Sequence, residues 1–593
     1  MPPELKEDKN EPLVGGDGLD PRSHKSKQRL PVHQAFRRPS FLDQIYLSGV
    51  PLKPIDLAFM MRGLVSSIWT VICLIFVDIP FLFLTRFSVN SERHPISWGA
   101  IYSFCMAVSR ASSSSVYNAA QLRMVSNTIA LFIPLRMLYL SNYRVQSDVR
   151  FKVHLDTLLI PERNSLAKTR ARLGLDTKSP KGNPVNPSRE YLESFLPVKG
   201  KLANLPEESG ALENDGTYML KGEWIEALDD PKQPSGKKRS NVVLLYAHGG
   251  GHVFCSVKFH RQLVTRMLLE FGPGARAFVL EYRLAPEDPF PAAIHDVYAA
   301  YLYLTQPNHE SITLIRDDVN CKHYTAPIDP RDIVLAGDSA GAGIAIAFQL
   351  YMRDYVRPSV EPKPEMPPVT VLMSAWTDIS TSMPSATSPR SFCYIPSPMG
   401  VNPFVDQETF FAFPKFNFAR AYLCGDSELV PNERNSLGED LEWEWYRHLA
   451  QHPLVSPVFT ADLSGLESST LLQTGTFDRL ADDTRLYAHK LGQANPDQRV
   501  RLELYRDMVH VHQFFEFLTM ANRALRSTVA FVEDAQKRHR HRHRQEGPRA
   551  KRRVRVTEWV VLDTDGTERE GHDDDSTPIA DLETYWRPDA KVY

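Results

Sequence analysis

From about residue 215 onward, the chain alternates short apolar runs with Gly- and Pro-rich clusters and helical stretches. Apolar runs bounded by turn residues are typical of buried strands, and strands that alternate with helices form mostly parallel sheets. The pattern therefore predicts an α/β fold with a mostly parallel central sheet flanked by helices. The expected core strands are 242–247, 277–282, 333–336, 369–374 and 470–474.

A longer apolar run lies nearer the N-terminus. Residues 63–85 contain a single charge, Asp78, and a run of about 20 apolar residues is long enough to cross a bilayer as a helix. Basic residues are more numerous before the run than after it, which predicts a single-pass protein with a cytoplasmic N-terminus. Because Asp78 is costly at mid-membrane and Pro80 can kink a helix, a buried or interfacial helical hairpin is the alternative.

These patterns divide the chain into regions. A second apolar stretch, 114–140, contains Arg123 and Arg136 and is predicted to be an amphipathic helix that packs over the functional site or lies on the membrane. Inserts are expected near 306–330 and 385–447, where a substrate lid could form. The predicted regions are a disordered tail over 1–55, a helical membrane-anchor and possible cap region over 56–145, an α/β domain over 146–535 and a charged, mostly disordered tail over 536–593.

Charge and composition narrow the classes of function. The formal net charge is −2, whereas a general nucleic-acid binder needs a basic excess on a folded face, so no nucleic-acid partner is expected. The basic runs of the C-terminal tail are predicted to be solvated, with a nuclear-import signal or contact with anionic headgroups as alternatives. The six cysteines lie far apart without CxxC pairs. This argues against structural zinc, and no metal or cofactor is expected.

The candidate nucleophile is Ser339, in the segment Gly337-Asp338-Ser339-Ala340-Gly341 between an apolar strand and a helix-forming run. Small residues around the serine permit a tight strand-to-helix turn that exposes its hydroxyl. The helix that follows directs its N-terminal amides toward the same place, where they favour developing negative charge. The sequence therefore predicts a nucleophilic serine at this turn.

A glycine-rich loop, His248-Gly249-Gly250-Gly251, follows the first expected core strand. Acyl transfer through a tetrahedral intermediate needs N–H donors where the oxyanion forms, and glycine amides are unobstructed donors. We expect the amides of Gly249, Gly250 and Ala340 to form an oxyanion hole, with a flexible turn as the alternative. His248 is predicted to orient the loop rather than to act as a base.

A third motif, YRLAPE followed by PFPAA, lies between the other two, and its Arg283 and Glu287 are expected to be paired structural charges. The order HGGG, YRLAPE, PFPAA and GDSAG resembles the hormone-sensitive-lipase-like branch of the α/β-hydrolases, which includes arylacetamide deacetylases and fungal steryl acetyl hydrolases. The resemblance covers residues 242–531 and implies the α/β-hydrolase fold and a serine hydrolase. The family often has glycine at the position of Cys255 and aspartate at that of Glu281, and both departures could reshape the acyl pocket.

The resemblance also implies the other catalytic residues. In this family the acid follows a late strand, which matches Asp478; Asp482 and Asp483 are alternatives at the start of the next helix. The base follows another strand, which matches His510, with His512 as the alternative. The order serine, acid, histidine is that of the α/β-hydrolase fold. In this interpretation the histidine takes the serine proton and the acid orients the imidazole.

Together these patterns indicate a membrane-associated carboxylic-ester hydrolase for apolar short-acyl or lipid esters, with steryl esters as one candidate class. Since such substrates partition into bilayers, membrane lipid is an expected partner, and the charge bias and the family resemblance favour the endoplasmic reticulum. One alternative is an amidase or deacetylase acting on xenobiotic amides. Another is a ligand-binding member of the fold that lacks catalysis.

Overall fold

The computed structural model describes the central part of the chain and several segments around it. The described residues are 137–154, 217–229, 236–315, 326–388, 393–395, 417–424, 450–544, 557–564, 567–571 and 578–582, together with 106, 109, 119, 122, 123, 126, 127, 129, 130 and 158.

An eleven-stranded sheet forms the centre of the described chain, in the order β11-β10-β9-β8-β7-β6-β3-β4-β2-β1-β5. The run from β10 to β4 is parallel, whereas β2, β1, β5 and β11 pair antiparallel to their neighbours. The strands are β1 Tyr143–His154, β2 Thr217–Ala227, β3 Val243–Ala247, β4 Arg276–Glu281, β5 Ile312–Leu314, β6 Ile333–Asp338, β7 Val369–Met373, β8 Ser469–Gly475, β9 Val500–Tyr505, β10 Thr557–Leu562 and β11 Glu568–Glu570.

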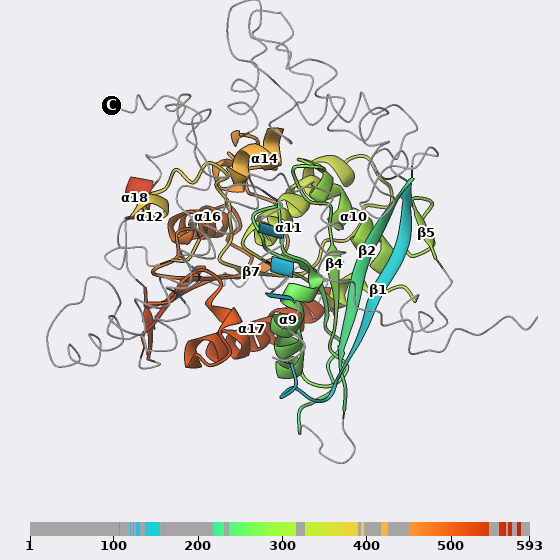
Figure 1. Ribbon diagram of the computed structural model, residues 1–593, viewed down its shortest axis with the longest axis horizontal. Coiled ribbons are helices and arrows are strands. Elements are labelled where there is room, and N and C mark those ends of the chain that lie inside the picture. The colour runs from blue at the N-terminus through green and yellow to red at the C-terminus, as the bar shows by residue number, and fades with distance from the viewer. Residues whose placement is uncertain are drawn as a thin grey trace, which may run out of the picture.

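Helices cover both faces of the sheet (Figure 1), with α9 and α17 against one face and α10, α11 and α16 against the other. Both faces of the sheet are covered because both are apolar. In β3, for example, Leu244 and Tyr246 face the layer of α9 and α17, while Val243 and Leu245 face the layer of α10, α11 and α16. The helices are α9 Val257–Phe271, α10 Ala292–Thr305, α11 Ala340–Tyr351, α12 Pro384–Thr387, α14 Phe418–Cys424, α16 Ala481–Ala494, α17 Thr519–Arg544 and α18 Ile579–Leu582, with a π-helical turn at Met352–Val356 and 3₁₀ turns at Pro330–Asp332, Pro457–Phe459 and His512–Phe514.

The predicted fold class is confirmed. The five expected core strands are β3, β4, β6, β7 and β8, each shifted by no more than a few residues at its ends. Nearly all of their residues are buried, as expected for strands that are covered on both faces.

The antiparallel strands at one edge of the sheet do not follow the predicted domain boundaries. β1 crosses the boundary expected at residue 145 and pairs with β2, so the α/β domain begins before residue 146. Within the insert expected near 306–330, residues Ile312–Leu314 form β5 and pair with β1. Both strands obtain their backbone partners from distant parts of the chain, which local composition does not reveal.

The C-terminal region is more structured than the predicted tail over 536–593. α17 continues through the run KRHRHRHR to Arg544. β10 then pairs in parallel with β9, and β11 pairs with β10. The prediction of a mostly disordered tail is therefore wrong over these segments, because a distant strand supplies the hydrogen-bond partners that a short strand needs.

The predicted span over 63–85 lies outside the described residues. None of the helices that the structure describes is long and apolar enough to cross a membrane. Within the stretch 114–140, the described residues from 119 to 130 are helical.

Candidate active site

Ser339 lies at the turn between β6 and α11. Its backbone has φ 54° and ψ −123°, a conformation that is strained for a residue other than glycine. The turn is held in place because the Ser339 N–H donates to Met373 O at 2.9 Å and the Ser339 carbonyl accepts from Trp376 N at 3.1 Å. The side chain makes no capping hydrogen bond to α11. The hydroxyl is therefore not used by the helix that it precedes.

A close backbone contact joins this turn to the glycine-rich loop. A Cβ atom at Gly341 would lie 2.1 Å from Ala247 O and 2.5 Å from His248 O. These distances are far inside van der Waals contact, so only glycine fits at this position. The first turn of α11 consequently packs directly on the backbone that leads into the loop.

The predicted acid and base are in contact. His510 Nδ1 lies 3.0 Å from Asp478 Oδ1 and 3.2 Å from Oδ2, and both residues are buried. The Asp478 carboxylate also accepts from Leu480 N at 3.0 Å and from Thr474 Oγ1 at 3.1 Å. Burial alone would raise the pKa of Asp478, but the imidazole and the hydrogen bonds hold it below its ordinary value. An ionised carboxylate thus faces the imidazole, as an orienting acid does.

Ser339 and His510 converge at the carboxyl end of β7. The strand that accepts the Ser339 amide continues into Ser374, whose hydroxyl accepts from Val511 N at 2.9 Å and hydrogen-bonds with Asp478. Among the described contacts, no hydrogen bond joins Ser339 to His510, a bond that is often long before substrate binds. The structure therefore brings the acid and the base together, and it joins the serine turn and the residue after His510 to the same end of β7.

The expected role of Gly249 in the oxyanion hole is wrong. Its amide donates to Asp338 Oδ1 at 3.0 Å and also lies 3.3 Å from His260 Nε2. An amide that is already hydrogen-bonded to a buried carboxylate cannot also point at a developing oxyanion. Sequence alone could not show this, because Asp338 reaches the loop from a distant motif.

The neighbouring amides remain available. Gly250 has φ 119°, and a Cβ atom there would lie 2.1 Å from Phe254 O, so this position requires glycine. Within the part of the chain that the structure describes, no acceptor takes the amides of Gly250, Gly251 or Ala340. The Gly251 amide thus replaces that of Gly249 in the candidate set of oxyanion donors.

Asp338 is a site residue that the sequence interpretation did not identify. Its buried carboxylate accepts from Tyr246 OH at 2.7 Å in addition to Gly249 N, and His260 Nε2 lies 3.2 Å from Oδ1. These groups fix the start of the glycine-rich loop to the residue before Ser339. The sequence does contain a signal for this role, namely an acidic residue inside a turn that is expected to be buried. A buried carboxylate requires several polar partners, so such a residue is expected to bind neighbouring groups.

His248 contacts the loop as predicted for an orienting residue. Its Nδ1 lies 2.7 Å from Gly249 O, and its ring stacks on Tyr282 with centroids 4.4 Å apart. Burial, with a smaller contribution from His260, lowers the pKa of His248 to about 3. A neutral imidazole packed in this way supports the loop and is not placed to act as the base.

The two departures from the family pattern have local structural roles. Cys255 has φ 70°, in the left-handed region where glycine is favoured, which explains why relatives often have glycine there. Glu281 Oε2 accepts from Val257 N at 3.0 Å, at the first residue of α9. Burial raises the pKa of Glu281 to about 7. Glu281 thus supports the start of a helix.

Arg283 and Glu287 are structural charges, but they do not pair with each other as expected. Arg283 Nη2 lies 2.8 Å from Asp296 Oδ1. Glu287 Oε1 instead accepts from Arg123 Nη1 at 2.7 Å, and Arg123 Nε also donates to Val253 O at 2.9 Å. The helical stretch that contains Arg123 therefore packs against the turn that follows the glycine-rich loop.

The alternative acids and base occupy other positions. Asp482 pairs with Arg485 at 2.9 Å, and Asp483 accepts from Thr377 N at 3.1 Å, both from the first turn of α16. His512 is buried, neither of its ring nitrogens forms a hydrogen bond among the described residues, and burial lowers its pKa to about 3. Among the described residues, no group of three His, Cys, Asp or Glu side chains is arranged to hold a metal ion.

Aromatic side chains cover the glycine-rich loop. The His252 ring stacks on Tyr422 of α14 with centroids 3.8 Å apart and lies 5.4 Å from Trp376. Phe418, also on α14, lies 6.1 Å from Phe254. α14 belongs to the insert expected near 385–447, so this insert contributes to the wall beside the candidate oxyanion donors.

Part of this chain matches a known protein family and several known proteins. Residues 244–400 and 414–514 match the model of a family described as alpha/beta hydrolase fold. An acetyl-hydrolase from Streptomyces hygroscopicus is 29% identical over 315 residues, which are 53% of this chain and 79% of that protein. Neutral cholesterol ester hydrolase 1 from Rattus norvegicus is 35% identical over 129 residues, which are 21% of this chain and 28% of that protein. A solved esterase from the bacterial hormone-sensitive lipase family is 27% identical, with a TM-score of 0.36 over 63% of this chain and 97% of that one.

Proposed function

Because this chain belongs to the α/β-hydrolase fold family and is a carboxylic-ester hydrolase, we propose that it hydrolyses apolar short-acyl or lipid esters through a triad of Ser339, His510 and Asp478. The observation that carries the proposal is the buried contact of 3.0 Å between Asp478 and His510. It lies beside a strained serine turn with three unoccupied backbone donors. This is the set of groups that acyl transfer needs.

In the proposed reaction His510 removes the Ser339 proton while the serine oxygen attacks the ester carbonyl. The amides of Gly250, Gly251 and Ala340 receive the negative charge that develops on the carbonyl oxygen. His510 then gives its proton to the departing alkoxide, which leaves an acyl-serine and an alcohol. Water, deprotonated by His510, attacks the acyl-serine, and the bond to the serine oxygen breaks as His510 returns the proton to that oxygen, which releases the carboxylic acid and restores Ser339. Asp478 stabilises the imidazolium in both halves.

The proposed preference for apolar substrates, steryl esters among them, has three supports. One relative is named as a neutral cholesterol ester hydrolase and another as an acetyl-hydrolase. The wall beside the oxyanion donors is aromatic, with Tyr422, Trp376 and Phe418 as members. The apolar run over 63–85 would hold the enzyme where such esters partition.

The proposed location follows from the same run. A single span over 63–85 with a cytoplasmic N-terminus would place the catalytic domain in the lumen of the endoplasmic reticulum, in contact with membrane lipid. The test is carbonate extraction of membranes that contain the full chain. A spanning protein stays in the pellet, whereas release into the supernatant would refute the span.

The activity is tested with purified full-length protein and its Ser339→Ala variant on p-nitrophenyl acetate and butyrate. We expect the substitution to lower kcat by at least about 1,000-fold, since it removes the nucleophile. Equal rates for the two proteins would instead favour the non-catalytic, ligand-binding alternative. Matched ester and anilide substrates then separate an esterase from an amidase or deacetylase, because both use the same residues.

A further inference from the structure

The last two strands, β10 and β11, follow the region that the family model matches and complete the sheet beside β9. β10 pairs with β9 along its whole length, from Thr557 opposite Val500 to Leu562 opposite Tyr505. The family match ends at residue 514. These two strands, called the added strands below, thus lie beyond the family match and extend the sheet next to β9, the strand that leads to His510.

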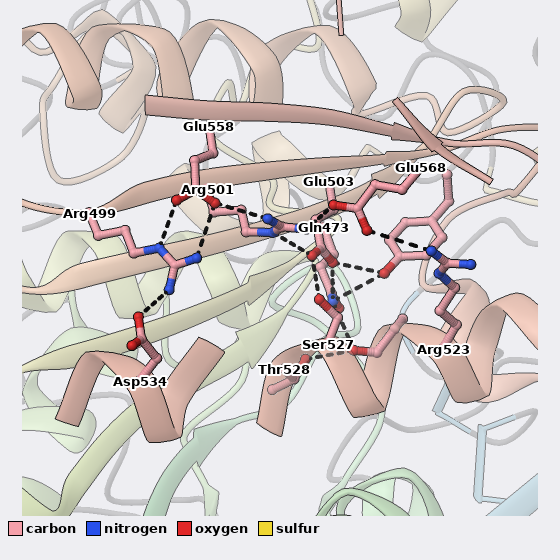
Figure 2. A network of polar contacts seen from close by, with 12 residues as sticks. Gln473, Arg499, Arg501, Glu503, Arg523, Ser527, Thr528, Asp534, Glu558 and Glu568 are labelled. Carbon is pink, nitrogen blue, oxygen red and sulfur yellow. Dashed lines mark hydrogen bonds and ion pairs between the residues drawn. The ribbon is translucent and has the colours of Figure 1, made fainter. Parts of the chain in front are cut away.

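Charged side chains fasten the added strands to β9 (Figure 2). Arg501 of β9 donates to Glu558 of β10 at 2.9 Å and to Glu568 of β11 at 2.8 Å. Arg499 donates to both carboxylate oxygens of Glu558, at 3.1 and 3.0 Å. Arg501 of β9 and Arg499, the residue before β9, thus both have acidic partners on the added strands, and Arg499 also pairs with Asp534 of α17 at 2.8 Å.

The same cluster continues into the interior. Arg501 Nε also donates to Glu503 Oε1 at 2.7 Å, and Glu503 is fully buried. The other Glu503 oxygen accepts from Gln473 Nε2 at 2.9 Å, and Gln473 Oε1 accepts from Gln513 Nε2 at 3.1 Å. Gln513 lies three residues after His510 in the 3₁₀ turn His512–Phe514. An unbroken series of polar contacts therefore joins the added strands to the residues that follow His510 in its loop. This loop, residues 506–515, is called the histidine loop below.

A second connection reaches the near side of that loop. Arg506 follows β9, and its amide donates to Leu562 O at 3.0 Å while its side chain pairs with Asp563 at 2.7 Å. Met508 N then donates to Tyr505 O at 3.3 Å to form the turn that leads to His510. Residues before and after the histidine are thus both tied to the added strands.

We propose that β10 and β11 position His510, with Arg501 as the positioning residue that transmits the contact of Glu558 and Glu568 to the histidine loop. The proposal rests on the proposed role of His510 as the general base. Arg501 is paired with the buried Glu503, and its guanidinium also contacts the two carboxylates of the added strands, which orient it. Loss of these carboxylates frees Arg501 to reorient, which disturbs Glu503, Gln473 and the loop that they support.

The kinetic test uses the full chain with Glu558→Gln and Glu568→Gln combined, which keeps side-chain size and removes both charges. We expect kcat on p-nitrophenyl butyrate to fall about tenfold with KM changed by less than about twofold, because the position of a base matters in the transition state rather than in substrate binding. The matched control is Glu570→Gln, an exposed glutamate on the same strand β11. For Arg501 itself, the Arg501→Lys variant should have a higher kcat than the Arg501→Gln variant.

Hydrogen exchange measured by mass spectrometry gives a readout that does not depend on catalysis. In the double variant, exchange in peptides covering 506–515 should become faster, while peptides covering β6 and α11 keep their rates. Unchanged loop exchange would overturn the inference even if the chain had no esterase activity. A variant that lost thermal stability but kept its kcat would also overturn it. Failure of the proposed function would be seen in a different experiment: the Ser339→Ala variant would turn over ester at the same rate as the wild type.

Discussion

The contact between the serine turn and the glycine-rich loop predicts a large catalytic effect from one added methyl group, Gly341→Ala. The new Cβ would lie 2.1 Å from Ala247 O, and real Cβ contacts essentially never fall below 3.0 Å. The two backbones must therefore separate by about 0.9 Å. Because Gly341 directly follows Ala340 and Ala247 lies three residues before Gly250, this separation displaces the candidate oxyanion donors from the serine.

A misplacement of about 1 Å costs about 100-fold in rate, which corresponds to about 2.7 kcal/mol of transition-state stabilisation. Overpacking should also lower the free energy of unfolding by about 1–3 kcal/mol. We expect kcat on p-nitrophenyl butyrate to fall about 100-fold while KM changes little, since the oxyanion forms only in the transition state.

The matched control is Ile344→Val in the same helix, α11. Ile344 is buried, so this change lowers stability by about 0.5–1.5 kcal/mol without touching the loop, and kcat should stay within about twofold of wild type. Chemical denaturation of both variants relates each kcat to its stability. If Gly341→Ala retained a kcat within about threefold of wild type while folded, the assignment of the oxyanion hole to this contact would be refuted.

Three further outcomes follow from the site. Asp478→Asn should lower kcat by about 10⁴-fold, because the amide presents an N–H group to the imidazole and favours the wrong tautomer; steady-state kinetics checks this. His510→Phe should abolish turnover whereas His512→Phe should leave kcat within about threefold, and equal losses would contradict the choice of base. Tyr246→Phe should lower the free energy of unfolding by about 1.5–3 kcal/mol at neutral pH, since it removes a hydrogen bond to a buried charge. Burial opposes ionisation of Asp338, but His260 and Tyr246 hold its pKa below 3.8, so its stabilising effect is present above pH 3.8 and is lost as the pH falls through the lower folded value. The difference between Tyr246→Phe and wild type, measured by urea unfolding at several pH values, should shrink in that range.

The parts of the fold that the sequence predicted are those encoded locally. β3 and β6 are apolar runs that end in glycine-containing turns, and both the strand and the turn can be recognised from a few adjacent residues. The same holds for Ser339, whose motif occupies one strand-to-helix turn. The family resemblance, which the comparisons confirm, then supplied the positions of Asp478 and His510.

The parts that were missed depend on contacts between distant residues. β10 reads TEWVVL within a strongly charged region, and nothing near it shows that β9 supplies its hydrogen-bond partners. The direction of the Gly249 amide likewise depends on Asp338, which is 89 residues away along the chain. Backbone amide directions are set by such tertiary partners, so a motif gives the location of a loop but not which of its N–H groups faces the substrate.

The edge position of β11 also bears on how this chain behaves while it is being made. Without β10 and β11, a chain still in synthesis would present β9 as an open sheet edge, a template for pairing with another copy. β11 consists of Glu568, Arg569 and Glu570, and charged side chains on a short final strand discourage such pairing. A chain that contains β9 but ends before residue 557 should therefore aggregate more readily than the full chain.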